Sequence, residues 1–115
     1  MRTIHKFILP QQESDSIIVK MPLGAIPLHA DFQNGALCVW ALVNTKSTMH
    51  PHIFYIRGTG QDCSALSPLA KHLNSFQIRI ESGVIGGKVQ EVVIHLFFYG
   101  PTDIRIDENI NSFGG

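Results

Sequence analysis

Five consecutive residues could bind an anion, and they read Arg57-Gly58-Thr59-Gly60-Gln61. They follow a strand-like apolar run, where successive backbone N–H groups can form a nest for a negatively charged group, with the Arg57 guanidinium beside it. The stretch lacks the longer glycine patterns of dinucleotide and nucleoside triphosphate sites. The favoured interpretation is a strand-ending turn, and a small-ligand or nucleotide site at these five residues is the alternative.

Histidine and cysteine side chains offer a second set of reactive groups. His50 and His52 could share a metal ion, but two ligands are too few for a structural zinc site, so a solvated loop end is favoured. Cys63 and His72 could act as nucleophile and base, although sequence spacing is no guide to catalytic pairs, which are assembled in space. Cys63 is therefore predicted to be an ordinary loop cysteine.

His95 lies within an apolar run and is predicted to be a hydrogen-bonded residue of the core or of a sheet face. No other combination of residues has the spacing of a catalytic or metal-binding motif. We therefore predict no catalytic residue, no metal and no cofactor, and expect that the protein is not an enzyme.

Length and charge limit the classes of protein that remain. The 115 residues are enough for one domain with its own core, and the apolar fraction of 44% is typical of a folded protein. The formal net charge is zero, whereas proteins that bind nucleic acid through its phosphates usually carry a basic excess. General nucleic-acid binding is thus disfavoured, and self-association meets little charge repulsion.

The sequence also predicts a location. It has no apolar run typical of a signal peptide and none as long as a membrane span, so a cytoplasmic protein is expected, with no membrane partner. Cys38 and Cys63 fit that compartment as free thiols. Cys38 is predicted to be a small core residue because it lies inside an apolar strand.

A hairpin over residues 32–43 is the clearest structural signal. Asn34-Gly35 suits a type I′ turn, which requires positive φ at both central residues. Residues 36–43 are apolar at every position, which is typical of a strand covered on both faces and central in its sheet.

The remaining strands are predicted from residue alternation and from the glycines and prolines that end them. Polar turn material is expected over 44–51, a Gly-rich turn over 82–88, and a long loop or short helix over about 61–74, with Ser67 as the cap. Pro27 argues against a central strand at its position, so the strand before the turn is expected to start after it. The predicted strands cover 2–9, 16–21, 28–33, 36–43, 52–58, 75–81 and 91–99, with a short addition over 103–106.

Short connections between successive strands predict an all-β fold, an antiparallel sandwich or flattened barrel of six to seven strands. Residues 1–108 are expected to form a single β domain, and residues 109–115 a loose C-terminal tail.

Several ordered motifs resemble a family of small uncharacterised proteins encoded by bacteriophages. The resemblance is carried by Thr3-Ile4-His5-Lys6-Phe7, Met21-Pro22-Leu23-Gly24-Ala25, Gln33-Asn34-Gly35, Cys38-Val39-Trp40-Ala41-Leu42-Val43 and Gly58-Thr59-Gly60. It covers about the first half of the chain and implies a phage-type protein in the host cytoplasm. It implies no activity, and no catalytic residue can be transferred.

These observations together favour a non-enzymatic protein that binds and modulates a host bacterial protein, as in host takeover. The strand over 91–99 is apolar on both faces, so one face is expected to be covered by a partner or a second copy. Phe97, Phe98 and Tyr99 are the predicted interface residues, and a homodimer is expected.

Overall fold

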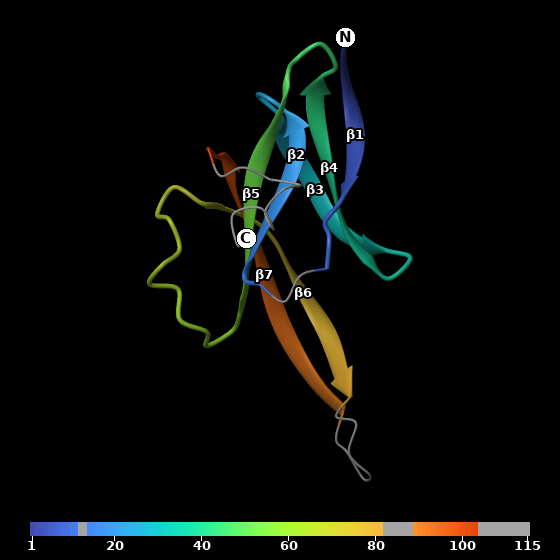
Figure 1. The fold of residues 1–115 in the computed structure, drawn as a ribbon. Helices are drawn as coiled ribbons and strands as arrows, with labels where there is room; N and C mark the ends of the chain where they lie inside the picture. Colours follow the sequence, from blue (N-terminus) through green and yellow to red (C-terminus); the bar gives the residue numbers. More distant parts are fainter. Residues whose placement is uncertain (12–13, 82–88, 104–115) are drawn as a thin grey trace, which may run out of the picture.

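The computed structural model describes residues 1–11, 14–81 and 89–103, and this part of the chain contains seven β-strands and no helix (Figure 1). The strands pair into two antiparallel sheets that do not close into a barrel, so the predicted all-β fold is confirmed in its sandwich form. The strands are β1 (Arg2–Ile8), β2 (Ser16–Pro22), β3 (Ile26–Gln33), β4 (Ala36–Asn44), β5 (Met49–Gly58), β6 (Lys71–Glu81) and β7 (Val89–Pro101).

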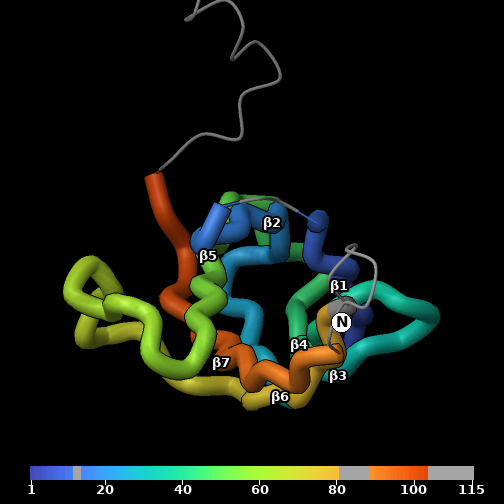
Figure 2. Tube along the Cα trace, turned by 90° about the horizontal axis from the view of Figure 1, so that it is seen from below, coloured from blue at the N-terminus to red at the C-terminus, as the bar shows by residue number. Residues whose placement is uncertain are grey.

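Sheet A has the strand order β1-β4-β3, and sheet B has the order β2-β5-β7-β6. Figure 2 shows the two sheets from one end, with β6 of sheet B beside β3 of sheet A. The apolar β4 is central in sheet A, as predicted, and β1 and β3 are the edge strands of that sheet.

The turn between β3 and β4 is the predicted one. Asn34 has φ 53° and Gly35 has φ 80°, so both central residues adopt the left-handed conformation that a type I′ turn requires. Gln33 and Ala36 face each other at its base.

The core lies between the sheets and is built from alternate residues of each strand. On β4 every second residue from Leu37 to Val43 is buried, and on sheet B the Phe54 and Leu96 side chains are fully enclosed. Phe32 of β3 meets Phe76 of β6 edge to face, with ring centroids 5.3 Å apart. A fully buried side chain of this size contributes about 1.5–3 kcal/mol by leaving water, so this layer supplies most of the stabilisation.

Among the strands that begin earlier than predicted, β3 and β5 each contain a proline near the new start. β3 starts at Ile26 and includes Pro27, which is tolerated because β3 is an edge strand with a register shift directly after the proline. β5 starts at Met49 and includes Pro51, which faces Lys20 of β2, so residues 49–51 are not loop.

The segment before β6 contains no helix. Residues 59–70 form turns, with Leu66 N donating to Cys63 O and Ala70 N donating to Ser67 O. β6 then begins at Lys71, four residues before the predicted start, because a register shift between His72 and Asn74 lets it continue along β7.

The paired ends of β6 and β7 extend beyond the other strands (Figure 1). Ile80, which its alternation predicts to face inward, is exposed there because the other sheet does not reach it. The expected turn over 82–88 and the tail over 109–115 lie outside the described residues. So does nearly all of the expected strand over 103–106, although Asp103 itself is not in a strand.

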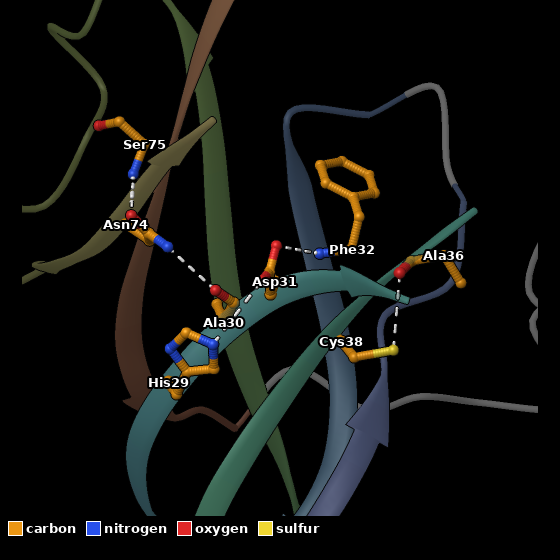
Figure 3. A network of polar contacts seen from close by, with 8 residues as sticks. All are labelled: His29, Ala30, Asp31, Phe32, Ala36, Cys38, Asn74 and Ser75. Atoms are coloured by element: carbon orange, nitrogen blue, oxygen red, sulfur yellow. Dashed lines mark hydrogen bonds and ion pairs between the residues drawn. The ribbon is translucent and has the colours of Figure 1, made fainter. Parts of the chain in front are cut away.

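Asn74 joins the two sheets where their edges meet (Figure 3). Its side-chain Nδ2 donates to Ala30 O on β3 at 2.9 Å, and its Oδ1 accepts from the backbone N of Ser75 at 2.8 Å. A partly buried carbonyl at the edge of β3 thereby gains a partner that strand pairing does not supply.

Candidate functional site

Three backbone amides of the Arg57–Gln61 loop donate to groups within the protein. Gly58 N donates to the Gln61 side-chain Oε1 at 2.8 Å, and Gln61 N donates back to Gly58 O at 3.0 Å. Thr59 N donates to Val93 O of β7 at 3.1 Å. An anion nest needs free N–H groups, so the loop as it stands offers a strand-ending turn rather than a phosphate cradle.

Arg57 is turned into the protein, with only 6% of its surface exposed. One terminal nitrogen donates to Ile56 O at 2.9 Å and to Asp15 O at 3.3 Å, and the guanidinium carbon lies 5.6 Å from the Tyr55 ring centroid. Gln61 adds a contact to the Asp15 side chain at 2.9 Å. Arg57 and Gln61 therefore fasten the loop to the start of β2.

Cys63 and His72 are not brought together as a nucleophile and base. The Cys63 thiol donates to Gln61 O in the exposed loop, whereas His72 Nε2 lies 2.8 Å from Ser75 Oγ on β6. Cys38 and Cys63 are both free thiols, Cys38 being buried in β4.

His50 and His52 lie in strand β5, which corrects the expected solvated loop end. His52 is fully buried, its Nδ1 lies 2.7 Å from His50 O, and its ring stacks on Phe98 with 6.0 Å between ring centroids. Burial away from water lowers the pKa of His52, more than the hydrogen bond to His50 O raises it. His52 is thus a neutral core residue whose Nε2 has no hydrogen-bond partner within the part of the chain that the structure describes.

The predicted interface residues of β7 divide between its two faces. Phe98 points inward, where its ring lies 5.0 Å from that of Phe54, so it belongs to the core. Phe97 and Tyr99 point outward, where Phe97 meets His72 and Tyr99 meets Tyr55 edge to face. His95 shares that outward side and contacts Thr59, its Nε2 lying 2.9 Å from Thr59 Oγ1.

The side of sheet A that faces away from the core carries a group of apolar side chains among polar ones. Ile4 of β1 and Ile26 of β3 both face Leu42 of β4, one from each side, and Lys6 and His29 flank Trp40 in the same way. We call this surface the outer face of sheet A and define it by its apolar members, Ile4, Ile8, Ile26, Trp40 and Leu42.

Three of these side chains are more than half exposed. The exposed fractions are 55% for Ile4, 58% for Ile8 and 51% for Ile26, while Trp40 and Leu42 on the central strand are half-buried by their neighbours. The His29 ring lies 5.6 Å from the Trp40 ring. Lys6 donates to Gln33 Oε1 at 2.7 Å, so its side chain crosses over β4.

Sequence analysis did not identify the outer face of sheet A as a site, although two signals for it are present. Residues 36–43 are apolar on both sides, and Ile4, Lys6 and Ile8 share one side of β1. The missing information was which of the two sides the second sheet covers, and no local pattern carries that.

Residues 1–101 match the model of a family described as a domain of unknown function, DUF7352, so the chain belongs to that family. Comparisons with curated proteins and with solved structures found no match. Within the described residues there is no helix that could span a membrane. In the same part of the chain, no group of three or more His, Cys, Asp or Glu side chains is placed to hold a metal ion.

Proposed function

We propose that this chain is a non-enzymatic interaction domain that binds another protein through the outer face of sheet A. The resemblance to bacteriophage proteins supports a phage-type protein whose partner is a host bacterial protein in the host cytoplasm. Binding to that partner would modulate its activity.

The observation that carries the proposal is the group of apolar side chains on the outward side of β4. Its inward side is buried against sheet B, and its outward side presents Trp40 and Leu42 between exposed isoleucines on both edge strands. Grouped apolar side chains on a protein surface are typical of interaction sites. Covering them removes apolar surface from water, which contributes a favourable free energy of about 25 cal/mol per Å².

Charges on this face indicate the chemistry of the partner. Lys6 contributes a cation, Asp31 a carboxylate, and His29 Nε2 lies 3.9 Å from that carboxylate. Charges of both signs among apolar side chains suit a protein surface with its own apolar patch, whereas a nucleic acid would require a basic surface.

A capture experiment with matched variants tests the proposal. The tagged protein is incubated with bacterial lysate, and captured proteins are identified by mass spectrometry for the parent, Ile4→Glu, Ile26→Glu and the control Ile80→Glu. Ile80 is as exposed as the face residues but lies on β6. We expect one partner that Ile80→Glu retains, that both face variants lose, and that rebinds the parent when purified.

Retention of that partner by both folded face variants would contradict the proposal. The proposal would also be contradicted if the parent formed a dimer that Ile4→Glu dissociated, since a second copy would then occupy the outer face of sheet A.

We propose that two copies associate through a different surface, the outward side of β7. Phe97 and Tyr99 point outward from β7 near Tyr55, and the net charge of zero does not oppose contact between two copies. A homodimer through the outward side of β7 would leave the outer face of sheet A free for the partner.

A further inference from the structure

A continuous chain of hydrogen bonds crosses the outward side of sheet B, from β6 over β7 to the loop after β5. Ser75 Oγ lies 2.8 Å from His72 Nε2 and 2.7 Å from His95 Nδ1. The other nitrogen of His95, Nε2, lies 2.9 Å from Thr59 Oγ1, and Thr59 Oγ1 donates to Val93 O at 3.4 Å.

Two opposite proton arrangements fit these contacts, because each hydroxyl and each neutral imidazole can both donate and accept. In the arrangement that activates Ser75, the Thr59 hydroxyl donates to Val93 O and Thr59 Oγ1 accepts from His95 Nε2–H. A neutral imidazole carries one N–H, which leaves His95 Nδ1 to accept the Ser75 hydroxyl proton. Ser75 Oγ in turn accepts from His72 Nε2–H.

The strand pairing holds these groups together. Ser75 and His95 face each other across β6 and β7, and facing residues of an antiparallel pair have Cβ atoms about 4.5–5.5 Å apart. Ser75 and His72 are exposed in the single chain, so a small molecule can reach the hydroxyl from solvent when this side is not paired with a second copy.

We propose that Ser75 is a nucleophilic hydroxyl, activated by His95 and positioned through Thr59, that accepts an acyl group from small uncharged carboxylic esters. Ser75 Oγ attacks the ester carbonyl carbon and its proton moves to His95 Nδ1. The tetrahedral adduct then expels the alcohol or phenol oxygen, which takes that proton from His95. The products are O-acyl-Ser75 and the free alcohol or phenol.

The acyl group is expected to remain on Ser75. The Ser75 N–H donates to Asn74 Oδ1 at 2.8 Å, so it is not free to hold an oxyanion in either acylation or hydrolysis. A phenol is a better leaving group than the Ser75 alkoxide, so a phenyl ester acylates Ser75 faster than O-acyl-Ser75 is hydrolysed. The reaction is therefore stoichiometric, a modification rather than turnover. It lies on sheet B and does not depend on binding at the outer face of sheet A.

The test uses 4-nitrophenyl acetate and the full chain with Cys63→Ala, which removes the exposed thiol. Nitrophenol release is followed by absorbance, and the label is located after tryptic digestion. The peptide of residues 72–79 contains Ser75 as its only hydroxyl group. We expect one acetyl group on that peptide and none with Ser75→Ala, while Ser64→Ala, at another exposed serine, leaves the rate unchanged.

Separate variants test His95 as the base and Thr59 as the residue that positions it. His95→Gln should slow acetylation on the order of a hundredfold, the usual contribution of a general base. Thr59→Val should slow it and Thr59→Ser should restore it, because Ser keeps the hydroxyl that accepts from His95. If His95→Gln does not fold by circular dichroism, the Thr59 pair decides.

Three results would overturn the proposal. One is equal acetylation of Ser64 and Ser75, and another is a Ser75 rate that His95→Gln or Thr59→Val leaves unchanged in folded protein. The third is persistence of the label on the peptide of residues 72–79 in Ser75→Ala, which would place it on His72.

Discussion

Ile4 and Ile26 lie on the two edge strands of sheet A, and both face Leu42 of the central strand, so three apolar side chains form a row on the side away from the core. The two isoleucines are more than half exposed. A sheet with one solvated side usually carries polar residues there. The departure from that pattern supports the proposal that this side meets a partner.

The β3–β4 turn gives a direct test of the fold. Gly35 has φ 80° and nothing within 4 Å of where a Cβ would stand, so Gly35→Ala adds backbone strain without a clash. We expect the free energy of unfolding to fall by about 1–2 kcal/mol, measured by urea denaturation. Gly58→Ala is the matched control because Gly58 lacks positive φ and an added Cβ would make only ordinary contact. Equal losses in the two variants would count against the turn.

The tie between the sheets depends on Asn74. Asn74→Ala removes the donor to Ala30 O and the acceptor of Ser75 N, and it leaves a partly buried carbonyl without its partner. The free energy of unfolding should fall by about 1–3 kcal/mol. Gln77→Ala is the control, because Gln77 lies on the same strand as Asn74 and its exposed side chain donates a hydrogen bond to Glu91 of β7. This variant should change the free energy of unfolding by less than about 0.5 kcal/mol. A loss no larger than that of the control would mean that the bridge to Ala30 contributes little.

His52 predicts how stability depends on pH. Burial lowers its pKa below 6.5 in the folded protein, so the unfolded chain takes up the proton first as pH falls. The stabilisation is present above this value and is lost as pH drops below it. His52→Leu should reduce the difference in Tm between about pH 8 and about pH 5, measured by scanning calorimetry. An unchanged difference in a folded variant would show that other groups cause the acid sensitivity.

The strands and the turn could be predicted because each depends on local chemistry. Alternation in residues 2–8 and positive-φ residues at Asn34-Gly35 act within a few positions. The early starts of β3, β5 and β6 could not be predicted from the sequence. Pairing with β4 and with β2 holds Pro27 and Pro51, respectively, in extended structure. The register shift near Asn74 arises only when β6 pairs with β7.

The candidate sites show the same division. The sequence predicts Thr59 as part of a loop site, but its hydroxyl contacts His95, and His95 contacts Ser75, both of which are distant from Thr59 in sequence. Phe97, Phe98 and Tyr99 were grouped by proximity in sequence, yet a strand sends successive side chains to opposite faces, and only the core contacts of Phe98 show which face is buried.

The two sides of β7 should respond differently to a charge. Phe98→Glu should unfold the protein because it buries a carboxylate beside Phe54, whereas Tyr99→Glu should fold because Tyr99 is exposed. Light scattering at several concentrations should show a dimer for the parent that Tyr99→Glu weakens and Ile4→Glu does not. A parent that is monomeric at every concentration would contradict self-association.

Trp40 permits the most direct test of the proposed binding surface, because it is the only tryptophan in the chain and lies at the centre of the outer face of sheet A. Protein labelled with 5-fluorotryptophan carries one fluorine, and its ¹⁹F NMR signal is recorded while the purified partner is added. We predict that the signal shifts or broadens in step with complex formation and that Ile4→Glu abolishes the change. A complex that forms while the Trp40 signal stays as in the free protein would contradict binding through this face.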